Sequence, residues 1–224
     1  MLGGFDLVRF LEYLIVLFIS IAIHEFAHAW TADRLGDPTP RYQGRVTLNP
    51  LAHLEPLGTL LIVFSSLAGV GIGWGRPVLT NPYRLRYGPR IGQGIVAVAG
   101  PISNIIQACV AAIPYRLLLA GGLRSPAIPT SVFELLGIYI IVNIGLAVFN
   151  MIPLPPLDGA WVIQGILAWI GGNWTYGVID FLDRVRMAGF MPLFLLVMLN
   201  SYVPILSMIM GPPSQLLRRF ILGL

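Results

Sequence analysis

The most constraining feature of the sequence is an apolar run at residues 10–31 that carries three ionisable side chains near its end. The run is long enough to cross the roughly 30 Å hydrocarbon core of a bilayer as a helix. Its segment HEFAH brings His24, Glu25 and His28 together. One ionisable side chain at bilayer depth costs roughly 2.5–3.5 kcal/mol on insertion scales, so three in one place indicate a function.

The whole chain has the composition of a membrane protein. Of its 224 residues, 56% are hydrophobic and 11% are charged, whereas soluble domains average about 25% charged residues. Further apolar runs lie at residues 57–74, 91–114, 131–152, 159–172 and 190–210. We therefore expect an all-α polytopic membrane protein, a bundle of about five to six membrane segments with any metal site inside it.

The chain is expected to form one membrane-embedded domain over residues 1–224. Its motifs lie at about residues 10–165, and an interfacial helix and a last span are expected at about residues 178–210. All 14 basic residues are arginines, and they lie in the connections between apolar runs, which fits contact with a lipid bilayer. No basic patch interleaves with aromatic residues, so the composition argues against nucleic-acid binding.

The HEFAH segment predicts a zinc site. Residues i and i+4 of a helix share a face, about 6 Å apart along the axis, so the imidazoles of His24 and His28 can reach one ion. Glu25 can then lie beside a metal-bound water whose pKa the ion lowers to about 7, and act as its base. The alternative is a pair of packed core histidines and a buried acid.

A catalytic zinc ion takes a third protein ligand and leaves the fourth position to water. The candidates are Asp158, His53 and Glu55, followed by Asp33 and Asp37. Asp158 is favoured because it follows PLPP at residues 153–156, where a helix cannot continue and an unwound backbone lets the carboxylate point into the bundle. Its alternative role is to cap a helix that begins at Gly159.

Two asparagines in the apolar runs are further candidates. Asn104 lies in AGPISN, and Asn150 ends the run at 131–152. Each could hydrogen-bond between helices, at about 0.6–2 kcal/mol, or hold a substrate strand and stabilise an oxyanion. The two roles are weighed evenly for Asn150, and the interhelical role is favoured for Asn104.

Three motifs in this order resemble the site-2 protease family of intramembrane zinc metalloproteases: HEFAH, AGPISN and NMIPLPPLDG. The resemblance implies one zinc ion per chain, held by His24, His28 and Asp158, with Glu25 as catalytic base. Asn150 matches the family asparagine that contacts the substrate or the transition state.

The chain is similar to compact family members that have no PDZ or CBS domain. Its segment GRVTLNPLAHLEPLGTLL, residues 44–61, resembles a signature of one bacterial subgroup, which makes His53 a candidate additional site residue. The alternative for His53 is a loop or interfacial histidine.

The implied function is hydrolysis of a peptide bond within or next to the transmembrane segment of a single-pass substrate, in the plasma membrane. The main alternative is a membrane metal-ion transporter that binds its ion at His24, His28 and Asp158. A third is an inactive scaffold that binds membrane partners. Glu25 separates protease from transporter, because a transporter needs no base beside the ion.

The ligand positions also constrain the topology. If residues 57–74 crossed the membrane, Asp158 would lie on the side opposite to the histidines. We therefore expect residues 57–74 to be re-entrant, which suits their glycines and serines because irregular backbone at membrane depth is tolerated only inside protein. Nine of the 14 arginines then lie on the metal side, and the positive-inside rule places that side in the cytoplasm.

Overall fold

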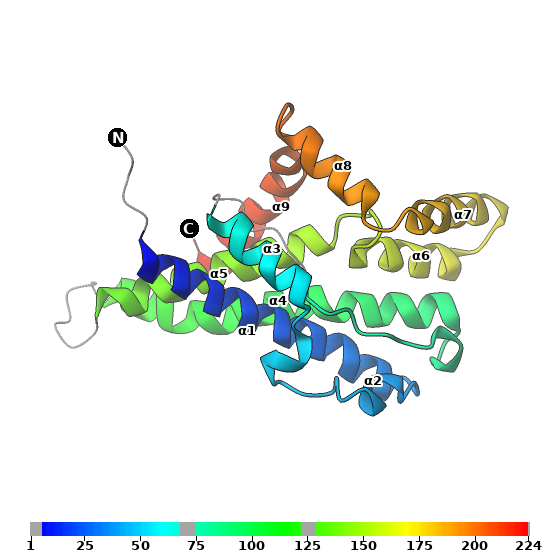
Figure 1. Cartoon of the computed structure of the whole chain (residues 1–224), viewed down its shortest axis with the longest axis horizontal. Coiled ribbons are helices and arrows are strands. Elements are labelled where there is room, and N and C mark those ends of the chain that lie inside the picture. Colours follow the sequence, from blue (N-terminus) through cyan, green and yellow to red (C-terminus); the bar gives the residue numbers. More distant parts are fainter. Residues whose placement is uncertain (1–5, 68–74, 122–128, 224) are drawn as a thin grey trace.

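The computed structural model describes residues 6–67, 75–121 and 129–223, and every regular element in these ranges is a helix. Three helices are long and apolar enough to cross a membrane: α1 (Leu7–Arg34), α4 (Pro89–Ala120) and α5 (Thr130–Asn150). They lie side by side along the long axis of the molecule (Figure 1). The predicted all-α polytopic membrane fold is confirmed.

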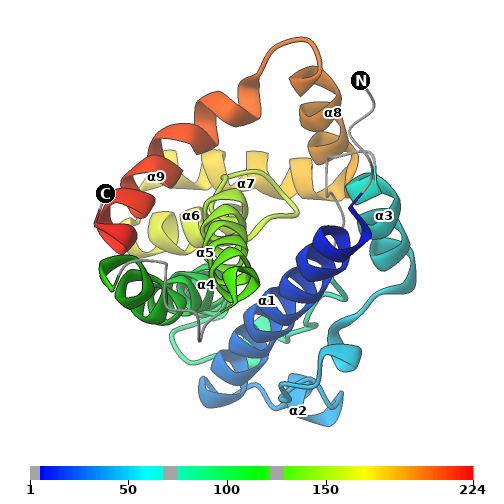
Figure 2. The ribbon, with the colours of Figure 1, turned by 90° about the vertical axis from the view of Figure 1, so that its left-hand side faces the viewer.

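Shorter helices connect and cover these three. In chain order they are α2 (Thr39–Tyr42), η1 (Pro50–His53), α3 (Pro56–Leu67), η2 (Pro82–Arg84), α6 (Asp158–Ile170), α7 (Asn173–Met187), α8 (Met191–Asn200) and α9 (Ile205–Leu222). α4 is central, because it packs against α1, α5 and α6. α9 covers α4 and α5 on the side away from α1 (Figure 2).

The last apolar run is broken. Instead of one continuous helix over residues 190–210, α8 and α9 meet at an angle of 90°. Pro204 precedes α9, and a proline has no N–H and disfavours a helical conformation in the residue before it. Within the described ranges the chain has three candidate spans, or four if the bent pair is one span.

The residues on either side of the segment 57–74 lie close together. α3 has 12 residues and is therefore about 18 Å long, too short to span a bilayer; residues 68–74 lie outside the described part of the chain. The Arg76 N–H donates to the His53 carbonyl at 2.8 Å. Residues 53 and 76, which flank this segment, are thus adjacent, and its re-entrant path stays a prediction.

The turn between α5 and α6 fixes where α6 begins. Gly159, its second residue, lies against this turn so closely that a Cβ there would be 2.3 Å from the Met151 carbonyl oxygen and 2.5 Å from that of Ile152. Both obstacles are backbone atoms, which cannot rotate away. A glycine at this position is therefore needed to bring Asp158 back against the bundle.

Replacing Gly159 by alanine is expected to lower the thermal stability of the detergent-solubilised protein, because overpacking against rigid atoms costs about 1–3 kcal/mol. The matched control is Gly145→Ala in α5, where a Cβ meets nothing within 4 Å and helix propensity favours alanine by about 0.5–1 kcal/mol. Equal melting temperatures for the two variants would contradict this description of the turn.

Candidate metal centre and active site

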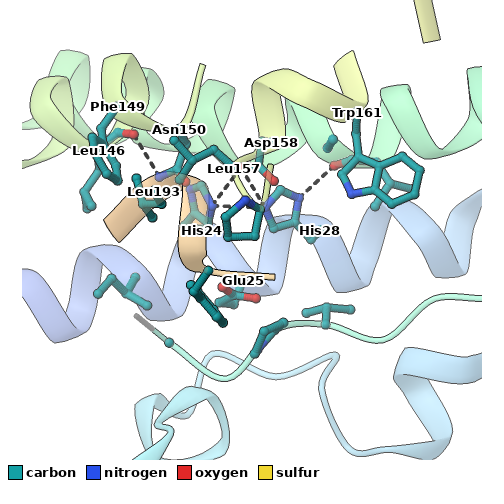
Figure 3. A pocket seen from close by; sticks show the side chains of 18 of the residues that line it. His24, Glu25, His28, Leu146, Phe149, Asn150, Leu157, Asp158, Trp161 and Leu193 are labelled. Carbon is teal, nitrogen blue, oxygen red and sulfur yellow. Dashed lines mark hydrogen bonds and ion pairs between the residues drawn. The ribbon is translucent and has the colours of Figure 1, made fainter. Parts of the chain in front are cut away.

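Three metal-binding side chains converge between α1 and α6. His24 and His28 lie one turn apart on α1, and their Nε2 atoms are 3.0 Å from each other. The Asp158 Oδ2 atom is 3.2 Å from Nε2 of His24 and 3.3 Å from Nε2 of His28. Figure 3 shows the two imidazoles and the carboxylate facing one another. Among the described residues these three form the one His, Cys, Asp or Glu group that could hold a metal ion.

Hydrogen bonds to α4 fix which nitrogen of each imidazole carries the proton. His24 Nδ1 is 2.6 Å from Asn104 Oδ1, and His28 Nδ1 is 2.8 Å from the Val96 carbonyl oxygen. Because both partners are acceptors, each Nδ1 donates, and each neutral ring presents the lone pair of Nε2 to the centre. Ligands oriented by a second hydrogen bond in this way are typical of protein metal sites.

The amide of Asn104 is itself held in place. Its Nδ2 donates to Asn143 Oδ1 at 2.8 Å, and Asn143 Nδ2 donates to Ser20 Oγ at 2.9 Å. These buried bonds join α1, α4 and α5. The predicted interhelical role of Asn104 is therefore present, and the same side chain also orients a candidate metal ligand.

The three converging atoms suit a zinc ion. Two nitrogen lone pairs and a carboxylate oxygen repel one another unless a proton or a metal cation lies between them. Oδ2 is buried with no hydrogen bond of good geometry from the described residues. Ligands at about 2.0–2.1 Å from a tetrahedral zinc ion lie about 3.3 Å apart. The observed separations are close to that value. Asp158 is not a cap, because α6 has no side-chain cap bond.

Gly100 provides the space for this centre. A Cβ at Gly100 would lie 2.4 Å from His28 Nε2 and 2.5 Å from His24 Cε1. α4 can therefore approach both imidazoles only because residue 100 has no side chain. Any larger residue would displace the rings from their hydrogen-bond partners.

Glu25 lines the same pocket and faces a buried arginine that the sequence analysis missed. Arg45 is 3% exposed, and its guanidinium lies 3.9 Å from Glu25 Oε2. It also donates to the carbonyls of Ala52 and Arg76, so it links these two residues to each other. Burial lowers the pKa of Arg45, and the negative charge of Glu25 opposes this shift.

The pocket has a volume of about 660 Å³ and is mainly apolar. Its walls come from α1, α4, the end of α5, the start of α6 and one face of α8, with Leu61 of α3 and the irregular residues 75–78. Asn150 lies in the wall and donates to the Leu146 carbonyl at 3.0 Å. Trp161, one turn after Asp158, also lines the pocket, and the guanidinium of Arg186 stacks 3.5 Å from its ring.

The other candidate ligands have different partners. His53 Nε2 is 2.8 Å from the Thr47 carbonyl, and burial lowers the pKa of this histidine. Glu55 caps α3 through the Gly58 N–H, Asp33 pairs with Arg41, and Asp37 accepts from Thr39 and Asn81. Of the five alternatives that the spacing left open, the structure brings only Asp158 to the histidines.

Comparison with known proteins decides the family. The chain is 39% identical over 179 residues to "Putative zinc metalloprotease YwhC" of Bacillus subtilis, an alignment that covers 77% of this chain and 79% of the relative. The model of peptidase family M50 matches residues 123–195. The chain belongs to peptidase family M50.

More distant relatives carry a similar name. "Putative zinc metalloprotease Rip2" of Mycolicibacterium smegmatis is 31% identical over 170 residues, which cover 71% of this chain and 61% of that protein. Rip2 of Mycobacterium tuberculosis (strain H37Rv) is 29% identical over 143 residues, 63% of this chain and 51% of that protein. No solved structure matches the chain.

Membership of family M50 confirms the resemblance to the site-2 proteases. The chain is a zinc metalloprotease and a membrane protein. The reading as a metal-ion transporter is therefore set aside.

The Asn104→Ala variant is expected to bind zinc about 10–100-fold more weakly, because His24 loses the bond that orients its ring. Zinc affinity is measured by competition with a chelator in detergent, and Asn200→Ala in α8 is the control. Wild-type affinity in Asn104→Ala would contradict a role of the Asn104–His24 hydrogen bond in metal binding.

Proposed function

We propose that this enzyme hydrolyses a peptide bond within or next to the transmembrane segment of a single-pass protein. The observation that carries the proposal is the position of the candidate metal centre, which opens into an apolar pocket bounded by the spanning helices α1 and α4. A pocket with such walls suits the side chains of a membrane segment.

The residues of the candidate centre and two of their neighbours have separate roles in the proposed reaction. His24, His28 and Asp158 would hold a zinc ion, which would supply Lewis acidity to a carbonyl oxygen and to water. Glu25 accepts a proton from the attacking water and delivers it to the leaving amine. Arg45 keeps the Glu25 carboxylate beside the pocket, and Asn150 contacts the substrate backbone.

The substrate must unwind to react. A regular helix hides its carbonyls in i→i−4 hydrogen bonds, so the segment at the cut has to become extended before a carbonyl reaches the site. Glycine, asparagine or proline near the cut lowers the cost of unwinding. We therefore expect membrane helices that contain such residues to be the preferred substrates.

The Glu25→Gln variant is expected to keep its zinc and lose at least about 100-fold in cleavage rate, because the amide cannot accept the proton. The assay follows cleavage of a single-pass substrate in detergent or liposomes, together with zinc content by mass spectrometry. Glu12→Gln, on the same helix and outside the pocket, is the control.

Full cleavage by Glu25→Gln would overturn the assignment of the base. Loss of zinc as well as activity in Glu25→Gln would instead make Glu25 part of the metal site. Failure of the wild-type enzyme to cut any membrane segment, while it cuts soluble peptides, would overturn the proposed substrate class.

We also propose that the protein lies in the plasma membrane and that its pocket opens toward the cytoplasmic side. The C-terminal end of α1 and the N-terminal end of α4 lie at the same end of the bundle, away from the N-terminus of α1 (Figure 1). The arginines between the end of α1 and the start of α4, in the part of the chain that the structure describes, lie on that side. The positive-inside rule places such connections in the cytoplasm.

Cysteine labelling tests this orientation in a Cys109→Ala background. Cysteines placed at the exposed positions Tyr42 and Tyr83 are expected to react with an impermeant maleimide only in inverted vesicles. A cysteine at Arg9, at the other end of α1, is expected to react in intact cells. Opposite accessibility of positions 42 and 83 would contradict the three-span topology.

A further inference from the structure

Gln93 on α4 is a polar group of the pocket that the proposed chemistry does not use. Six residues with charged, imidazole or amide side chains line the pocket: His24, Glu25, His28, Gln93, Asn150 and Asp158. Four of them belong to the candidate catalytic centre. The two amides remain, and they differ in how their N–H groups are used.

The amide nitrogen of Gln93 has no protein partner in the described part of the chain. Its oxygen accepts from the Thr80 hydroxyl at 2.8 Å, which fixes the orientation of the amide. By contrast, Asn150 Nδ2 already donates to the Leu146 carbonyl. Gln93 is 9% exposed and lines the pocket, so this N–H is available to a group that enters the pocket.

We infer that Gln93 binds the substrate by donating from Nε2 to a backbone carbonyl. This inference rests on the proposed function, because an extended peptide presents free carbonyls to the pocket walls. Gln93 also joins two of these walls, since Thr80 follows the irregular residues 75–78 and Gln93 belongs to α4. A peptide bound between these walls passes the free N–H.

The helix geometry places this bond away from the reacting carbonyl. Gly100, which touches both imidazoles, is seven residues from Gln93 along α4, a rise of about 10 Å. An extended peptide advances about 3.3 Å per residue. Gln93 therefore meets a carbonyl about three residues from the cut, and it contributes to substrate affinity and register rather than to the chemical step.

Steady-state kinetics with a single-pass substrate test the inference. In Gln93→Leu and Gln93→Glu, which lack the N–H donor, KM is expected to rise roughly 3- to 10-fold, as for the loss of one hydrogen bond. Turnover, kcat, is expected to stay within about twofold of wild type because the catalytic centre is untouched. Melting temperature and zinc content show whether each variant is folded.

Gln107→Leu is the matched control. Gln107 lies on the same helix, is 8% exposed, accepts from a hydroxyl through its oxygen and has an unpartnered nitrogen. It differs from Gln93 in lying outside the pocket. An equal rise in KM for Gln107→Leu, or an unchanged KM in both Gln93 variants, would overturn the inference.

Ester substitution in the substrate identifies the acceptor. Replacing one backbone amide by an ester weakens its carbonyl as an acceptor, so wild type should lose affinity at one position about three residues from the cut, and Gln93→Leu should not. Substrate binding is also measured in the inactive Glu25→Gln background, with and without Gln93→Leu. This comparison tests the role of Gln93 without hydrolysis. Absence of cleavage by wild type would contradict the proposed function and leave this binding comparison intact.

Discussion

The fold has to hold three electron-rich atoms close together against their mutual repulsion. Two imidazole lone pairs and one carboxylate oxygen lie about 3 Å apart inside a bundle with apolar walls. A cation between the three atoms would relieve this repulsion. Other features of the fold bring the three atoms to their positions. The proline-rich turn returns Asp158 to α1, Gly100 leaves room for the rings, and Asn104 and the Val96 carbonyl hold their protons on the outer side.

Much of the centre could be predicted because its signals are local. The i, i+4 spacing in HEFAH sets the two histidines on one face of a helix whatever surrounds it. The prolines before Asp158 break the chain at a place where a carboxylate can turn inward. The sequence position of Asn104 fits both a bond between helices and a role in the site, and the structure combines the two.

The features that were missed depend on contacts between distant segments. Arg45 lies in a loop, and nothing in its neighbours indicates that it is buried beside Glu25 or that it holds residues 52 and 76 together. Prolines were equally ambiguous. α4 continues through Pro101 and Pro114, because a packed membrane helix tolerates the lost hydrogen bond, whereas the last apolar run breaks at Pro204.

The bonds from Ser20 through Asn143 and Asn104 to His24 have a thermodynamic consequence. The same contacts that associate three spanning helices also orient a candidate metal ligand, so helix association and ion affinity would be linked. A change that weakens helix association would also lower the affinity for the ion. By reciprocity, a bound ion would raise the free energy needed to separate the helices. In lipid, where the hydrophobic effect contributes little to helix association, a bound metal ion would act as part of the scaffold.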